Sequence, residues 1–232
     1  SGKYVYLFSV NGPESTIITG SNSYQVLYIE NNQGQETIVK GFSISDGRPG
    51  SDNHASAIKV GSGLARFENL IIENNGGGSG NTVAFGSGID STKFIDCVVR
   101  NNSVENYAGL RESTNIRCVL YGNSGWNNTS VLLNGYSLNC VIYNNGSGYS
   151  SGLAGGSAKN CIFWNNSSGA GWGADSITYS NIEGGYTGTG NINSNPLFVD
   201  ATNGDYHLTS SSPCIDAGDP TSDLDPDGTV AD

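Results

Sequence analysis

Short apolar segments recur along the middle of the chain, and each is closed by two polar residues. Five of them align without gaps, at residues 67–75, 94–102, 115–123, 137–145 and 158–166. Each has one anchor residue, then three strand-forming residues, then Asn-Asn or Gly-Asn. The anchors are Leu70, Cys97, Cys118, Cys140 and Cys161, spaced 27, 21, 22 and 21 residues apart. Self-similarity at a nearly fixed period predicts a repeat architecture.

The position two residues after each anchor is always apolar. Copies that depart further from the pattern have their anchors at Phe42 and Ser180, and they extend the set. The members are Ile44, Ile72, Val99, Leu120, Ile142, Phe163 and Ile182. Because residues two apart face the same side of a strand, we expect anchors and this set to form a buried core.

A second apolar series repeats in step with the first. Its members are Ile89, Leu110, Leu132 and Leu153, spaced 21, 22 and 21 residues apart. A period near 22 also suits a leucine-rich repeat, but these repeats are rich in Gly, Ser and Asn, which disfavours helices. The pattern therefore predicts an all-β solenoid of stacked coils, with about 21–22 residues per coil in the middle repeats.

An Asn stands five residues after each of the five anchors. These residues are Asn75, Asn102, Asn123, Asn145 and Asn166. Asn adopts left-handed backbone conformations readily, so we expect it to end the strand and turn the chain. Stacked in register, the side chains would form a structural amide ladder.

Both ends of the sequence carry motifs that resemble the right-handed parallel β-helix, or pectate-lyase-like, superfamily. Residues 9–20 are similar to the first coil of many bacterial surface proteins of this kind, and residues 195–200, 205–208 and 212–220 to their C-terminal coil. The resemblance implies one right-handed solenoid over residues 1–190, with a C-terminal coil and acidic loop of the same domain over 191–232. The family's usual strands before Ser1 and after Asp232 are missing, so we expect end-to-end or edge association through the trimmed ends.

Charge narrows the choice of partners. The formal net charge is −11 with only 10 Lys and Arg, which excludes nucleic acid as an expected partner. No apolar stretch is long enough to span a membrane. Together with the resemblance, this predicts an extracellular or cell-surface location.

Four of the five cysteines occupy the anchor position. Stacked anchors lie roughly 4.8 Å apart with parallel Cβ directions, which does not suit a disulfide. We expect Cys97, Cys118, Cys140 and Cys161 to be buried free thiols.

Several charges occupy equivalent positions in neighbouring coils. The alignment pairs Glu73 with Arg100, Asp96 with Arg117 and Asp90 with Arg111. These are cross-strand ion pairs in one interpretation. In the other, Lys93, Arg100, Arg111 and Arg117 form a catalytic patch, because a β-helix lyase needs a Lys or Arg base near carboxylates, often with calcium.

Tyr121, Tyr143 and Trp164 stand three residues after successive anchors, where the side chains face outward. A column of aromatic rings is a surface on which sugar rings stack, so it predicts carbohydrate binding. The alternative is that the column packs beneath a loop or stabilises the sheet.

Asp223, Asp225 and Asp227, followed by Gly228, match the first half of an Asp-x-Asp-x-Asp-Gly calcium loop. The twelfth position of such a loop would be 234, beyond the end of the chain. The residues predict either a calcium site or a solvated acidic tail.

These observations favour a non-catalytic extracellular module that contacts an extended polysaccharide as part of a larger surface or secreted protein. The alternatives are a polysaccharide lyase or related carbohydrate-active enzyme, and a structural spacer or adhesin. Superfamily members include all three kinds, so the fold does not select among them.

Overall fold

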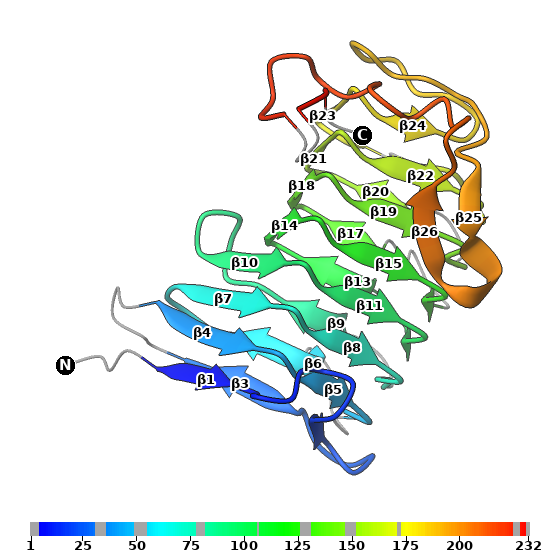
Figure 1. Cartoon of the computed structure of the whole chain (residues 1–232). Coiled ribbons are helices and arrows are strands. Elements are labelled where there is room, and N and C mark those ends of the chain that lie inside the picture. The colour runs from blue at the N-terminus through cyan, green and yellow to red at the C-terminus, as the bar shows by residue number, and fades with distance from the viewer. Residues whose placement is uncertain are drawn as a thin grey trace.

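Three parallel β-sheets make up most of the computed structural model (Figure 1). It describes residues 5–30, 36–48, 55–77, 82–105, 107–125, 131–146, 152–170, 173–224 and 228–230. The three sheets are here called A, B and C. Apart from two short strands that pair with each other, the first twenty strands enter sheets A, B and C in repeating order, so each turn of the chain adds one strand to each sheet. This connectivity is compatible with the predicted parallel β-helix. It confirms an all-β protein built from parallel sheets.

Sheet A consists of β1 (Tyr6–Phe8), β4 (Thr37–Lys40), β7 (Ala65–Glu68), β10 (Thr92–Ile95), β14 (Thr114–Ile116), β18 (Tyr136–Leu138), β21 (Ser157–Lys159) and β23 (Ser176–Thr178). Sheet B consists of β2 (Ile17–Thr19), β5 (Ser43–Ser45), β8 (Ile71–Glu73), β11 (Val98–Arg100), β15 (Val119–Tyr121), β19 (Val141–Tyr143), β22 (Ile162–Trp164) and β24 (Asn181–Ile182). Sheet C consists of β3 (Leu27–Ile29), β6 (Ala55–Val60), β9 (Thr82–Phe85), β13 (Tyr107–Arg111), β17 (Leu132–Leu133) and β20 (Leu153–Ala154). A short parallel pair joins β12 (Ser103–Val104) and β16 (Ser124–Gly125).

The predicted core column lies in sheet B. Ile44 is in register with Ile72, and the same register continues coil by coil to Phe163 and Ile182. All seven members are essentially inaccessible to solvent. The copies anchored at Phe42 and Ser180 are therefore confirmed as members of the same column of sheet B. Opposite them, Phe67 and Phe94 stack in sheet A with ring centroids 4.8 Å apart.

The second apolar series is correct for three members and wrong for one. Leu110, Leu132 and Leu153 are in register in sheet C. In the preceding coil, however, Ala84 lies opposite Leu110, and Ile89 is exposed in the turn between β9 and β10. The anchor spacing here, from Leu70 to Cys97, is 27 residues against 21 or 22 in the next three repeats, and the extra residues extend the turn. The spacing of 21 from Ile89 is therefore coincidental.

The amide ladder is confirmed, but the turn residue is not the one predicted. Asn75, Asn102, Asn123 and Asn145 each donate from the side-chain amide to the next ladder Asn, over 2.9–3.1 Å. The left-handed conformation belongs to the preceding residue. Those residues are Asn74, Asn101, Gly122, Asn144 and Asn165, with φ between 50° and 63°.

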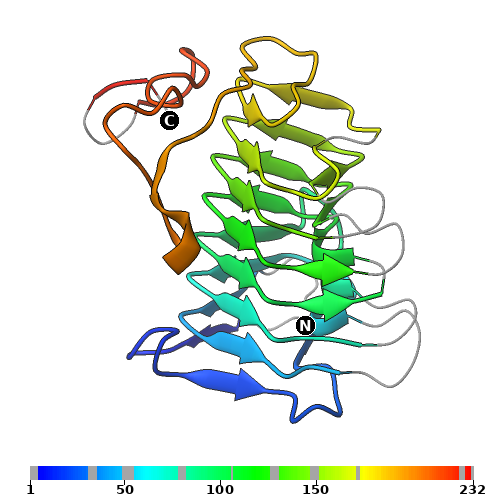
Figure 2. The same ribbon diagram turned by 90° about the vertical axis from the view of Figure 1, so that its right-hand side faces the viewer.

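The C-terminal segment departs from the parallel pattern. Within the predicted C-terminal coil, β25 (Phe198–Asp200) and β26 (Asp205–Leu208) form an antiparallel hairpin closed by the 3-10 turn η1 (Ala201–Asn203). Figure 2 shows this hairpin as an arm beside the stack. Among the described residues, no helix has the length and apolar character needed to cross a membrane.

Candidate functional site

The outward aromatic column has the predicted register. Tyr121 lies opposite Tyr143, and Tyr143 opposite Trp164, on strands β15, β19 and β22. The hairpin packs against the first two. The ring of Tyr206 lies 5.3 Å from the ring of Tyr121 and 5.3 Å from that of Tyr143, measured between centroids. Tyr121 and Tyr143 therefore pack beneath a chain segment, while Trp164 is half-buried at the end of the column.

Phe198 completes this aromatic cluster from the other strand of the hairpin. Its ring meets Tyr143 edge-on at 5.6 Å and Tyr206 at 5.4 Å. Burial raises the pKa of Tyr206, and the neighbouring phenols of Tyr121 and Tyr143 raise it further. The three tyrosines thus join hairpin and sheet as neutral rings in edge-to-face or tilted contacts, which aromatic pairs favour.

The tip of the hairpin is fixed by local hydrogen bonds. The carboxylate of Asp200 accepts from the backbone N–H of Asn203 at 3.3 Å and from its side-chain amide at 2.7 Å. Gly204 follows with φ of 83°, and a Cβ there would lie 3.4 Å from the hydroxyl of Tyr121. Glycine is favoured at this position because the φ angle lies in the left-handed region, which side chains with a Cβ rarely adopt.

A cleft of about 440 Å³ opens between the hairpin and sheet B. Val119 and Val141 line the sheet side, and residues 203–207 line the hairpin side. The imidazole of His207 is 91% exposed, and its Nδ1 lies 2.6 Å from Oδ1 of Asp205. Hydrogen bonds from the side chain and the backbone N–H of His207 lower the pKa of Asp205. The cleft thus combines an apolar floor with a polar wall.

Arg100 lies next to the aromatic column, on β11, which is the neighbour of β15 in sheet B. Its guanidinium donates to Glu73 at 2.7 Å and to the hydroxyl of Tyr121 at 3.1 Å. Burial lowers the pKa of Arg100, but these two hydrogen bonds outweigh burial and the pKa is raised. Arg100 is therefore charged at any accessible pH, and Glu73 balances its charge.

The four basic candidates for catalysis lie on different parts of the stack. Lys93 is in sheet A, Arg100 in sheet B and Arg111 at the end of β13 in sheet C. Arg117 follows β14 at the corner between sheets A and B. The fold separates these side chains among its faces.

Two of the three predicted ion pairs are confirmed. Arg100 pairs with Glu73, and Arg117 forms a bidentate pair with Asp96 at 2.6 and 2.9 Å. The third is wrong, because Arg111 pairs with its neighbour Glu112 at 3.1 Å. Asp90 lies in the same extended turn as Ile89, which takes it out of the register assumed for the pair.

The anchor cysteines are free and buried, as predicted, and so is Cys214. Burial raises the pKa of the Cys97, Cys118 and Cys140 thiols well above the ordinary range. They act as core residues.

The calcium prediction stays a prediction. Asp223 is exposed, while Asp225 and Asp227 lie outside the described residues. Within the ranges that the structure describes, no group of three or more His, Cys, Asp or Glu side chains is placed to hold a metal ion.

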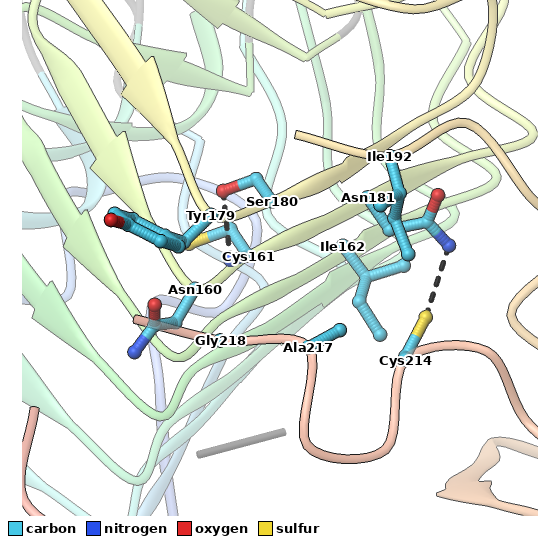
Figure 3. Close-up of a pocket in the computed structure, with 10 residues that line it drawn as sticks. All are labelled: Asn160, Cys161, Ile162, Tyr179, Ser180, Asn181, Ile192, Cys214, Ala217 and Gly218. Carbon is cyan, nitrogen blue, oxygen red and sulfur yellow. Dashed lines mark hydrogen bonds between the residues drawn. The ribbon is translucent and has the colours of Figure 1, made fainter. Parts of the chain in front are cut away.

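How the C-terminal segment closes the last coils could not be predicted from the sequence. Lys159 and Asp219 form an ion pair at 2.5 Å, and the backbone N–H of Asp219 donates to the side chain of Asn160. Figure 3 shows Asn181 directed at Cys214, to which it donates at 3.0 Å. The pocket lined here has a volume of about 10 Å³, room for one water molecule. The motif at 212–220 predicts a coil, and nothing in it identifies its contact residues.

Comparison of the chain with protein-family models, with curated proteins and with solved structures finds no match. The interpretation of the site therefore rests on the chain's own residues.

Proposed function

We propose that the chain is a right-handed parallel β-helix module that acts outside the cell and binds an extended polysaccharide without cleaving it. The observation that supports this is the cleft between the hairpin and sheet B. Sugars present apolar C–H faces and many hydroxyl groups. The floor of Val119 and Val141 suits the former, and Asn203, Asp205 and His207 offer hydrogen bonds to the latter.

The cleft also has the right position for a long ligand. Its floor residues lie in neighbouring coils of one column, and Trp164 stands in the next coil of the adjacent outward column. A polymer that follows the stack would meet the cleft and then this indole. Tyr121 and Tyr143 hold the hairpin, so Trp164 is the aromatic residue of the column that we propose to stack against a sugar ring.

We propose binding without cleavage because the basic side chains that a lyase would need lie in different sheets, apart from one another. Arg100, Arg111 and Arg117 each pair with a carboxylate, which reduces their capacity to act as a base or to bind a uronate. A polysaccharide lyase remains the alternative, and it would produce unsaturated sugars that absorb in the ultraviolet.

The test is a panel of polysaccharides, read by retention in affinity electrophoresis and by ultraviolet absorbance of products, with calcium and with chelator. Retention should weaken at least tenfold for His207→Ala combined with Asn203→Ala, and for Trp164→Ala. The matched control is Tyr136→Ala, which removes a half-buried aromatic from the outward side of sheet A. Loss of retention only with chelator would support a calcium requirement, which Asp223→Asn would reproduce. Unsaturated product would contradict the proposal and favour the lyase.

A structural spacer or adhesin is the second candidate. It is favoured by the use of Tyr121, Tyr143 and most arginines in contacts within the chain. This candidate predicts neither retention nor product with any polysaccharide of the panel.

A further inference from the structure

The net charge of the chain is distributed very unevenly along the sequence. Residues 160–232 contain ten Asp and Glu residues and no Lys or Arg, so they account for −10 of the formal net charge of −11. The first 159 residues hold all ten Lys and Arg and are almost neutral. The acidic segment includes the hairpin beside the stack (Figure 2), which forms one wall of the cleft, and it also includes Trp164. The cleft wall and the indole proposed to stack against a sugar thus belong to a segment without a Lys or Arg.

Within the cleft, the acidic charge of the wall is that of Asp205. Among the described residues that line the cleft, the ionisable side chains are those of Asp205, Tyr206 and His207. Hydrogen bonds from His207 lower the pKa of Asp205, so its carboxylate is ionised at neutral pH. Burial raises the pKa of Tyr206, so its phenol is neutral there. A ligand in the cleft therefore meets a carboxylate, and the described lining offers no Lys or Arg to balance it.

A second carboxylate stands next to Trp164. Glu183 follows β24, which pairs with β22, and its backbone N–H donates to the carbonyl of Phe163 at 3.0 Å. The carboxylate of Glu183 accepts the backbone N–H of Asn165, the residue after Trp164, at 2.5 Å. Glu183 therefore belongs to the coil that follows Trp164. A polymer that passes from the cleft to Trp164 would run between two carboxylates, those of Asp205 and Glu183.

Two arginines near the cleft are already paired with carboxylates. Arg100, on β11 next to the aromatic column, pairs with Glu73 at 2.7 Å. Arg117, two residues before Val119 of the cleft floor, forms its bidentate pair with Asp96 at 2.6 and 2.9 Å. Each pair is neutral as a unit. Neither arginine therefore compensates the acidic wall.

We propose that the cleft takes an uncharged polysaccharide, and that Asp205 and Glu183 repel polyuronates and other anionic polysaccharides. This inference rests on the proposed function, because it specifies which polysaccharide the same cleft binds. Hydroxyl groups of an uncharged sugar can donate to both carboxylates, and hydrogen bonds to an ionised acceptor are stronger than those between neutral groups. An anionic polymer instead places its own charges beside the two carboxylates, and juxtaposed like charges oppose binding.

The test compares polysaccharides that share a backbone and differ in charge. Hydroxyethyl cellulose and carboxymethyl cellulose form the first pair. Each uncharged polysaccharide that the panel retains is then paired with its carboxymethyl ether, and each acidic one with its carboxyl-reduced form. The dissociation constants are measured by isothermal titration calorimetry at about pH 7.5, where exposed histidines are ordinarily neutral, with calcium and with chelator.

Salt distinguishes repulsion from a difference in fit. In about 50 mM salt, the uncharged member of a pair should bind at least about tenfold more tightly than the anionic member. In about 500 mM salt this ratio should shrink, because salt screens the repulsion, while Kd of the uncharged member should stay the same within about twofold.

A pair of substitutions tests whether the two carboxylates are the cause. Asp205→Asn combined with Glu183→Gln removes both charges and keeps a hydrogen-bond acceptor at each position. It should tighten binding of the anionic member at least about fivefold, which is the effect of removing one like charge at contact distance in water. The matched control is Asp90→Asn combined with Glu14→Gln, at two exposed residues in other turns. It changes the net charge equally and should tighten binding by less than about twofold.

The outcomes separate this inference from the proposed function. Tighter binding of the anionic member of a pair, in either buffer, would overturn the inference and leave a polysaccharide-binding module. So would equal tightening by the double variant and its control, because the repulsion would then not come from Asp205 and Glu183. Tighter binding of glycol chitosan, a polycation, than of its uncharged N-acetylated form at the higher salt concentration would also overturn it. Binding of neither member of any pair would contradict the proposed function itself, and the inference with it.

Discussion

The side chains of Asn102 and Asn123 are joined across neighbouring coils by a 2.9 Å hydrogen bond from Nδ2 of the first to Oδ1 of the second. The same oxygen accepts the backbone N–H of Asn102 at 3.1 Å. Asn123 in turn donates its amide to the carbonyl of Val99 and to Oδ1 of Asn145. One buried side chain therefore satisfies polar groups in the coils on both sides of its own, where water does not reach them.

Asn123→Ala should destabilise the chain strongly. It removes the acceptor of two buried donors of Asn102 and leaves the carbonyl of Val99 without its side-chain donor. Buried groups left without partners cost about 1–3 kcal/mol each, so we expect a total loss of about 3 kcal/mol in the free energy of unfolding. Urea denaturation measures it. The control is Asn134→Gly, at an exposed residue with φ of 49°, where Gly adopts the same backbone at little cost. Equal losses in both variants would contradict a stabilising ladder.

The ladder shows what the repeat pattern could predict. The fifth position after the anchor is Asn in all five aligned copies, as a buried amide with fixed partners requires. The position before it is Asn in four copies and Gly in one, Gly122. That Gly was the signal for the left-handed residue, because Gly and Asn share only the tolerance of positive φ. Two adjacent Asn residues concealed the distinction.

The errors at Ile89 and Asp90 have a different physical origin. Strand register in a stack is set by hydrogen bonds between coils, whereas the turns between strands vary freely in length. A match in spacing inside a turn therefore carries no information on register. The small residues Val83 and Ala84, which fill the core at that place, lack the periodic large side chain that reveals a strand in the sequence.

The hairpin could not be predicted because its contacts are specific to this chain. The outward position of Tyr121 and Tyr143 followed from alternation, but their partner Tyr206 is more than 60 residues away in the sequence. Nothing in the local pattern of residues 195–208 distinguishes a hairpin beside the stack from another coil of it.

Tyr206→Ala should undock the hairpin while leaving the stack folded. Tyr206 contacts Tyr121, Tyr143 and Phe198, and aromatic pairs contribute about 0.5–1.5 kcal/mol each beyond their buried area. A loss of about 2 kcal/mol would raise the open population of the hairpin roughly thirtyfold. Limited proteolysis within residues 201–204 measures this population. His207→Ala is the control, because that exposed ring makes no contact with the aromatic cluster. Unchanged proteolysis of Tyr206→Ala would contradict the proposed role of the cluster.

Acid should weaken closure of the last coils through Asp219. The hydrogen bond from Lys159, together with that from the backbone N–H of Thr221, lowers the pKa of Asp219 from 3.8 to about 2. Because the folded pKa lies below the unfolded value, the contribution to stability is present above pH 3.8 and is lost as the pH falls towards 2. The pKa of Lys159 is raised, chiefly by the bond to Asp219, so its contribution is lost only as the pH rises past the ordinary value of 10.5.

The measurement is the free energy of unfolding of the wild type and of Asp219→Asn between pH 2 and pH 7. The difference between the two should be constant from pH 7 to about pH 5 and should shrink as the pH falls to 2. The exposed Asp90→Asn variant should differ little from the wild type throughout. A difference between wild type and Asp219→Asn that does not change with pH would contradict the role of the ion pair.

The five cysteines should be unreactive in the folded protein. Burial raises the pKa of Cys97, Cys118 and Cys140, and the attacking species in thiol labelling is the thiolate. At about pH 8, Ellman's reagent should therefore label the native chain only as fast as it unfolds, and should label all five thiols in denaturant. Ser211→Cys, at an exposed residue, should add one thiol that reacts at once. Rapid labelling of any native cysteine would mean that the anchor column opens locally, and a redox role would then have to be considered. Slow labelling limited by unfolding would fit thiols that serve only as apolar core residues.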